Sequence, residues 1–153
     1  MKLYTKPTKR KKTYRKTVFE MVCQSNPKEI GCIEQFLQQV NKKLDLDDGT
    51  MYRLLVSCTE AVNNAIVHGN KSDPNKSVTI RCIIEKQSLT IRVKDEGKGF
   101  DPEGLQDPRE GKNLLKENGR GVFLIRSLMD SITVKRLKSG SVVEMKIKLH
   151  KQY

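Results

Sequence analysis

Two polar side chains one helical turn apart are the first candidates for chemistry in this sequence. Glu60 and Asn64 are four residues apart, so on a helix they share one face. A glutamate can act there as a general base toward a hydroxyl group, and an asparagine offers Mg²⁺ a neutral oxygen ligand. Taken alone, this pair fits a polar helix face without a site equally well.

Two glycine-containing segments further along the chain are candidates for holding a nucleotide. Asp95 follows a predicted strand and precedes Gly97 and Gly99. A carboxylate there can accept a hydrogen bond from an exocyclic amine, and the glycines let a flat base approach the backbone. Gly119 and Gly121 open a predicted helix, where free N–H groups favour phosphate. Taken singly, the segments also fit a plain turn and a flexible helix entry, and neither matches a P-loop or a dinucleotide-binding pattern.

Three more polar residues are candidates for contacts with a nucleotide. Lys116 and Arg120 are cations in or beside a long irregular segment and can steady the β- and γ-phosphates. Ser141 begins the last predicted strand and can donate to a base or a bound water near Asp95. A solvated loop charge and an ordinary turn serine are the simpler explanations for these three.

The elements that must position these residues follow from the hydrophobic pattern. Periodicity and turn residues predict the following order: a strand at 16–23, helices at 27–44 and from an acidic cap at 46–49 to 68–70, strands at 78–84 and 89–93, a helix at 121–129, and strands at 131–137 and 141–149. Glu60 and Asn64 lie at the border of the apolar stripe of the second helix. The order predicts an α+β fold, a two-layer sandwich of a mixed, mostly antiparallel sheet with helices on one face. Residues 94–118 have no strong period, and a loop of that length in a compact domain is usually functional or disordered.

Composition limits the classes of protein that this chain can represent. A length of 153 residues with 36% hydrophobic and 31% charged residues fits one globular domain. No apolar run approaches the roughly 20 residues that span a bilayer, and no apolar stretch follows the basic N-terminus as in a secretory leader. We therefore expect a cytoplasmic protein. The four cysteines lack metal-ligand spacing and are expected to be reduced and to pack as small hydrophobic residues.

The positive charge is concentrated at the N-terminus. Residues 1–16 carry eight of the net +12 charges and no acid, so the rest of the chain carries only +4. Such a segment can bind nucleic acid or an anionic membrane. A solvated, disordered tail is the favoured interpretation, because only two tyrosines accompany the basic residues. The sequence therefore divides into a tail at 1–15 and a domain at 16–153.

The three motifs together resemble a known superfamily. Glu60, Asn64 and Ala65, then Asp95 with Gly97 and Gly99, then Gly119 and Gly121 are similar to the N, G1 and G2 boxes of the Bergerat-fold ATPases. Within that superfamily, residues 57–69 (SCTEAVNNAIVHG) and 118–130 (NGRGVFLIRSLMD) resemble the bacterial anti-sigma-factor serine kinases. The resemblance covers residues 16–150.

The resemblance implies a fold, a ligand and a function. ATP is expected under the long loop, with Glu60 as catalytic base, Asn64 as Mg²⁺ ligand and Asp95 as the adenine-binding aspartate. The glycines of both boxes are implied to shape the phosphate and base contacts. Ser141 stands where the family often has a threonine. The implied partners are a small antagonist protein that accepts phosphate on serine or threonine, and a sigma factor bound by a homodimer.

Three other functions stay open at this point. The chain can be a non-catalytic binding module in which the bound nucleotide controls the affinity for a partner protein. It can also be another Bergerat-fold ATPase, such as the catalytic domain of a histidine kinase, although neither His68 nor His150 is placed as a phosphoacceptor. A nucleic-acid-binding protein is the least expected, because it rests on the basic tail alone.

Overall fold

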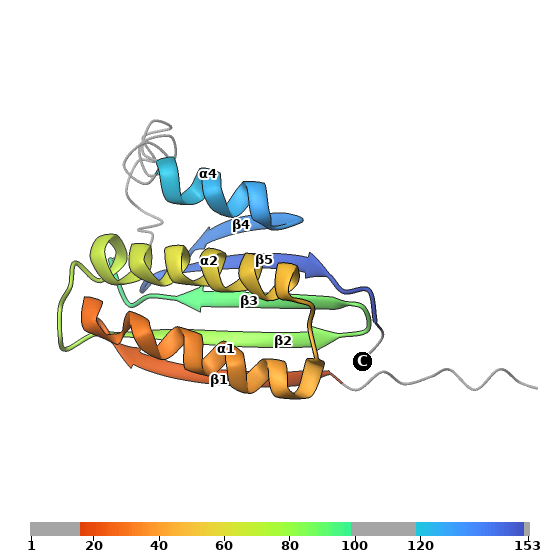
Figure 1. The fold of residues 1–153 in the computed structure, drawn as a ribbon. Helices are drawn as coiled ribbons and strands as arrows, with labels where there is room; N and C mark the ends of the chain where they lie inside the picture. Colours follow the sequence, from red (N-terminus) through yellow and green to blue (C-terminus); the bar gives the residue numbers. More distant parts are fainter. Residues whose placement is uncertain (1–15, 99–118, 152–153) are drawn as a thin grey trace, which may run out of the picture.

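A five-stranded sheet with helices on one face forms the body of the protein (Figure 1). The computed structural model describes residues 16–98 and 119–151. Every strand pair among them is antiparallel, and the spatial order is β1-β2-β3-β5-β4. The strands are β1 (Thr17–Gln24), β2 (Ser77–Glu85), β3 (Ser88–Lys94), β4 (Ser131–Arg136) and β5 (Ser141–Lys148).

Among the described residues, the helical layer consists of three α-helices and two short extensions. It contains η1 (Pro27–Ile30), α1 (Gly31–Leu44), α2 (Asp48–Asn64), η2 (Ala65–Gly69) and α4 (Gly119–Leu128). Helices α1 and α2 cover one face of the sheet and run roughly along its strands, and α4 lies beside α2 above β4 (Figure 1). Asp47 caps α2, because its carboxylate accepts from the Thr50 N–H at 2.9 Å and from the Thr50 hydroxyl at 2.7 Å.

The core lies between the sheet and α1, α2 and α4. The residues Ile33, Leu37, Leu54, Ile80 and Ile125 are at most 2% exposed, and α2 contacts strand β3. Strand residues on the helix-facing side alternate with polar residues on the other side, as a half-covered antiparallel sheet requires. This packing makes α2 a fixed platform for the polar residues at its border.

Three of the four cysteines are small core residues, and the fourth is exposed. All four are free, and Cys23, Cys58 and Cys82 are buried. Burial raises the pKa of the Cys82 thiol to about 12 and also raises that of Cys58, so both stay neutral at physiological pH. Cys32 alone of the four is exposed.

The predicted element order and α+β fold are confirmed. Two details differ from the periodic pattern: residues 27–30 form a 3₁₀ turn before α1, and the end of the second helix widens into the π-helical η2. No parallel strand pair occurs in the part of the chain that the structure describes. None of the described helices is long and apolar enough to cross a membrane. The predicted tail at 1–15 and most of the long segment at 94–118 lie outside the described residues.

Candidate functional site

Helices α2 and α4 bring the first and last motifs together. Glu60 and Asn64 are half-buried on the side of α2 that meets the first turn of α4. A methyl group placed on Gly121 would lie 2.8 Å from Glu60 Oε2 and 3.4 Å from Asn64 Nδ2. A side chain at position 121 would therefore displace the Glu60 carboxylate, while the distance to Asn64 is an ordinary contact. The glycine lets the N-terminal turn of α4, whose first N–H groups have no acceptor within the helix, lie against a carboxylate and a carboxamide.

Asp95 forms the second part of the site, at the end of β3. Its side chain is 7% exposed. Oδ1 accepts from the N–H of Gly97 at 2.9 Å and from the N–H of Ser141 at 3.1 Å. Oδ2 takes part in no hydrogen bond among the described residues. Burial raises the pKa of this carboxyl above its usual value, although the two N–H donors and the charges of Lys76 and Arg136 oppose the shift.

Three glycines enclose the Asp95 residue. A methyl group on Gly69, the last residue of η2, would lie 2.5 Å from Asp95 Oδ2. A methyl group on Gly97 would collide with the carbonyl oxygen of Gly69. One on Gly140, whose φ is 103°, would collide with the carbonyl oxygen of Asp95. The glycines therefore let three backbone segments close around one carboxylate whose second oxygen is left for a ligand.

One continuous helical run joins the two parts of the site. Glu60 and Asn64 lie in the second half of α2, and Gly69 ends the π-helical extension that follows it. The run places Glu60 and Gly69 roughly 13 Å apart along the helix axis. A π-helical turn is uncommon and is often found at functional sites. The Glu60 part and the Asp95 part therefore form two ends of one elongated region.

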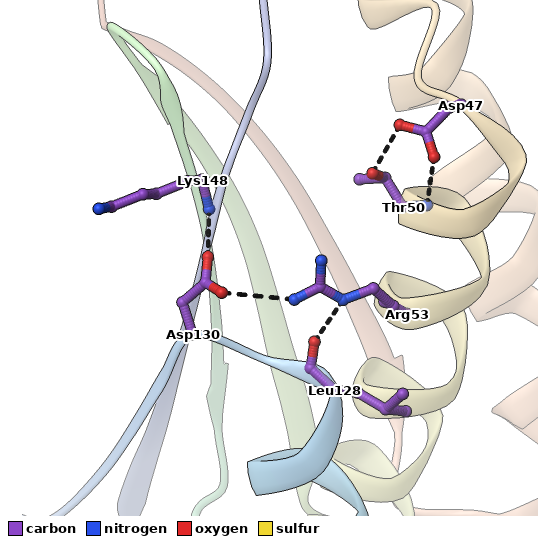
Figure 2. A network of polar contacts seen from close by, with 6 residues as sticks. All are labelled: Asp47, Thr50, Arg53, Leu128, Asp130 and Lys148. Carbon is purple, nitrogen blue, oxygen red and sulfur yellow. Dashed lines mark hydrogen bonds and ion pairs between the residues drawn. The ribbon is translucent and has the colours of Figure 1, made fainter.

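The far end of α4 is tied to α2 and to β5 (Figure 2). Arg53 Nε donates to the carbonyl oxygen of Leu128 at 2.5 Å, and Arg53 Nη2 lies 3.4 Å from Asp130 Oδ1. Asp130 Oδ2 accepts from the N–H of Lys148 at 2.6 Å. These contacts satisfy a carbonyl group at the C-terminus of α4 with a cation. They fix the helix whose other end carries Gly121.

The predicted site residues that the structure describes fall into these two parts, and two predicted residues are not described. Ser141 lies beside Asp95, but its contacts are main-chain contacts, with the Asp95 N–H donating to the Ser141 carbonyl at 3.0 Å. Gly119 and Arg120 begin α4, and Arg120 is exposed. Gly99 and Lys116 lie outside the described residues.

The polar groups of the two parts fit an adenine nucleotide and a metal ion bound to its phosphates. Within residues 16–98 and 119–151, no cluster of three histidine, cysteine, aspartate or glutamate side chains can hold a metal. Mg²⁺ prefers few protein ligands together with phosphate oxygens, so the single carboxamide of Asn64 suits it. The uncommitted Oδ2 of Asp95, enclosed by backbone, suits the amine of a base.

Comparison with known proteins identifies the family. Residues 23–147 match the histidine kinase-like ATPase domain. The chain belongs to this family. The resemblance drawn from the three motifs is thereby confirmed, and the ATP-binding fold is that of the family.

Individual relatives in this ATPase family are serine-protein kinases and anti-sigma factors. The chain is 31% identical over 132 residues to serine-protein kinase RsbW of Bacillus subtilis, covering 82% of each chain. It is 36% identical over 104 residues to anti-sigma F factor of Geobacillus kaustophilus, covering 66% of this chain and 70% of the relative.

Solved structures share the fold at lower identity. The RsbU and RsbW domains of a Mycobacterium tuberculosis protein align with a TM-score of 0.64 at 12% identity, over 87% of this chain and 32% of theirs. The histidine kinase domain of a blue-light activated Erythrobacter litoralis kinase aligns with a TM-score of 0.51 at 21% identity, over 78% and 61%.

Four residues around the site were not singled out by sequence reasoning. They are Arg53, Gly69, Asn70 and Gly140, and each acts on a residue that is distant in the sequence. The only local signal was a glycine-asparagine pair at a helix end and a serine-glycine turn. Those signals predict where elements end but give no indication of which carboxylate lies nearby.

Proposed function

We propose that this ATPase-family chain is an ATP-dependent serine/threonine protein kinase that phosphorylates a small antagonist protein in a partner-switching pathway. The observation that carries the proposal is the contact of Gly121 with Glu60 and Asn64. A carboxylate and a carboxamide beside a helix N-terminus, which favours phosphate, support the roles of base and neutral oxygen ligand. Binding of a sigma factor belongs to the same proposal, by analogy with the relative named anti-sigma F factor. Self-association as a homodimer, which the resemblance of the motifs implies, belongs to it as well.

The roles of the chain's own residues follow from their chemistry. Asp95 orients the adenine through Oδ2, since Oδ1 is already committed to two backbone donors. The N–H groups at the start of α4, together with Arg120, face the phosphates. Glu60 takes the proton from the acceptor hydroxyl as that oxygen attacks the γ-phosphate. Asn64 would hold Mg²⁺, which when bound offsets the charge of the phosphate oxygens.

The proposed Glu60 base favours a kinase over a module that only binds nucleotide. A binding module needs Asp95 and its enclosing glycines, but it has no need for a carboxylate at the phosphate end. In this chain position 121 is a glycine, and a side chain there would displace Glu60 Oε2. The glycine therefore leaves space for a carboxylate beside the proposed phosphate site. Transfer of phosphate to a hydroxyl needs a base at that place.

Transfer of labelled phosphate tests the proposal directly. The full chain is incubated with [γ-³²P]ATP, Mg²⁺ and each small antagonist-type protein encoded in the same genome. Label on a serine or threonine of one acceptor supports the kinase. Tight ATP binding without label on any acceptor would replace the kinase with a nucleotide-gated binding module.

Removing the Arg53 contacts is expected to weaken ATP binding at the phosphates without affecting the adenine site at Asp95. Arg53→Met deletes the donor to Leu128 O and the ion pair to Asp130 while keeping an unbranched side chain. Because an exposed ion pair contributes little, we expect most of the effect from the unsatisfied helix carbonyl, with ATP affinity falling about fivefold. Adenosine affinity is expected to stay within about twofold, since no phosphate contact is involved.

Calorimetric titration with ATP and with adenosine separates the two effects. Arg81→Met is the matched control, because Arg81 pairs with Glu20 on the sheet face opposite the helices. Equal losses of adenosine and ATP affinity in Arg53→Met would show that α4 does not act on the phosphate end alone.

A further inference from the structure

A fully buried asparagine links the end of the α2–η2 helical run to the backbone that carries Asp95. Asn70 is 0% exposed and follows Gly69 directly. Its Oδ1 accepts from the N–H of Glu96 at 2.7 Å. Its Nδ2 donates to Ser25 Oγ at 2.6 Å and to the carbonyl oxygen of Ser77 at 2.8 Å. One side chain thereby holds three separate segments.

The bond to Glu96 is the one that bears on the site. Glu96 is the residue between Asp95 and Gly97, and the Gly97 N–H is one of the two donors to Asp95 Oδ1. The bond to Asn70 therefore fixes the peptide group that joins Asp95 to Glu96, and the Gly97 N–H fixes the next one through its own bond to Asp95 Oδ1. The orientation of the Asp95 carboxylate depends on this short stretch of backbone.

The Glu96 side chain strengthens the same link from the other direction. Its Oε2 accepts from the N–H of Ser77 at 2.6 Å and from the Ser77 hydroxyl at 2.9 Å, and the Ser77 backbone bond lowers the pKa of this carboxyl. Asn70, Ser77 and Glu96 thus close a ring of hydrogen bonds. Polar networks of this kind are rigid when every buried member is satisfied.

We propose that Asn70 is a positioning residue for base recognition. It holds the Glu96 backbone so that Asp95 Oδ2 faces the exocyclic amine of an adenine base and repels the carbonyl oxygen of a guanine. This inference rests on the proposed ATP-binding function and assigns the selectivity of that site to a residue that does not contact the nucleotide. Only an amide side chain supplies the required acceptor and two donors in one plane.

The decisive test compares ATP and GTP binding in Asn70→Ala. Loss of the acceptor for Glu96 is expected to lower ATP affinity about tenfold. GTP affinity is expected to change by less than about twofold, because GTP gains nothing from an oriented Asp95 carboxylate. The ratio of ATP affinity to GTP affinity therefore falls. ATP affinity is measured by calorimetry and GTP affinity by competition. General structural damage would lower both affinities in proportion and leave the ratio unchanged.

Two control variants separate the Glu96 bond from other consequences. Asn41→Ala removes a side chain whose Oδ1 likewise accepts a backbone N–H, that of Leu46 at 2.7 Å, where α1 ends. Ser25→Ala removes one partner of Asn70 Nδ2 and leaves the Glu96 bond in place. Both are expected to keep the ATP to GTP ratio of the unchanged protein, whatever they do to its melting temperature.

Hydrogen exchange in the unchanged protein provides a second measurement that needs no variant. If the Asn70–Glu96 bond supports base binding, base binding must support that bond by the same free energy. The Glu96 amide is therefore expected to exchange more slowly when adenosine is saturating. An unchanged Glu96 exchange rate, or an unchanged ATP to GTP ratio in a folded Asn70→Ala protein that still binds ATP, would overturn the positioning role. Absence of ATP binding in the unchanged protein would instead overturn the proposed function.

Discussion

Replacing Glu60 with glutamine is expected to slow phosphate transfer to the acceptor protein at least about 100-fold. ATP affinity is expected to stay within about twofold, because glutamine has the same shape and makes no new collision with Gly121. A general base contributes only as the acceptor hydroxyl loses its proton, so its loss appears in the transfer rate and not in nucleotide binding.

The geometry explains why glutamine is a sharper test than alanine. Glu60 Oε2 occupies the space beside the Cα of Gly121, with Asn64 Nδ2 close to the same point. Alanine would empty that space and let the first turn of α4 shift. A loss of transfer could then come either from the missing base or from the displaced phosphate site. Glutamine fills the space and removes only the ability to accept a proton.

Single-turnover transfer from [γ-³²P]ATP, measured beside an ATP titration, checks the expectation. Glu85→Gln is the matched control, because it makes the same change at an exposed position where β2 ends, away from Asp95. Transfer at an undiminished rate in Glu60→Gln would remove Glu60 from the role of base. A parallel loss of ATP affinity would assign Glu60 to nucleotide binding instead.

Local signals were sufficient to predict the elements of this fold. The apolar stripe at 51–66 predicted α2, and the acidic residues before it predicted the cap that Asp47 provides. The short gap between the predicted strands at 131–137 and 141–149 predicted the hairpin of β4 and β5. The position of β5 between β3 and β4 could not be predicted in this way. Strand order depends on cross-strand packing between residues about fifty positions apart, which leaves no local trace.

The candidate site shows the same division between local and distant information. Glu60, Asn64 and Asp95 were predicted because their chemistry is visible in their residue types and spacing. Gly69 and Asn70 were interpreted only as a helix end, although they also contact Asp95 and Glu96. Their roles arise where η2 meets the end of β3, and a contact of that kind exists only once the sheet has formed.

Asp95→Asn is expected to weaken ATP binding about 100-fold while making the protein more stable at neutral pH. Oδ1 of the asparagine is expected to keep both N–H donors, those of Gly97 and Ser141. The amide nitrogen must then take the place of Oδ2 beside Gly69. A donor would face the donor amine of adenine there, which replaces an attraction with a repulsion.

The gain in stability follows from the burial of the charged group. Burial raises the pKa of Asp95, so the folded state holds its proton at a pH where the unfolded chain has lost it. As pH rises from the ordinary aspartate value of about 3.9 through the raised pKa, the unchanged protein loses stability relative to the variant. Below that window both states carry the proton, and the advantage of asparagine disappears.

Thermal unfolding between pH 4 and pH 8, combined with ATP titration, tests both halves of this expectation. Asp73→Asn is the matched control, since Asp73 Oδ1 accepts the N–H of the residue two positions on, Asn75, at 2.9 Å, as Asp95 does with Gly97. A melting temperature of Asp95→Asn that lies below the unchanged protein at every pH would show that the ionised carboxylate stabilises the fold. Opposite changes in stability and ATP affinity would show that the buried charge is kept for binding, because the fold alone is better served by a neutral side chain at the end of β3.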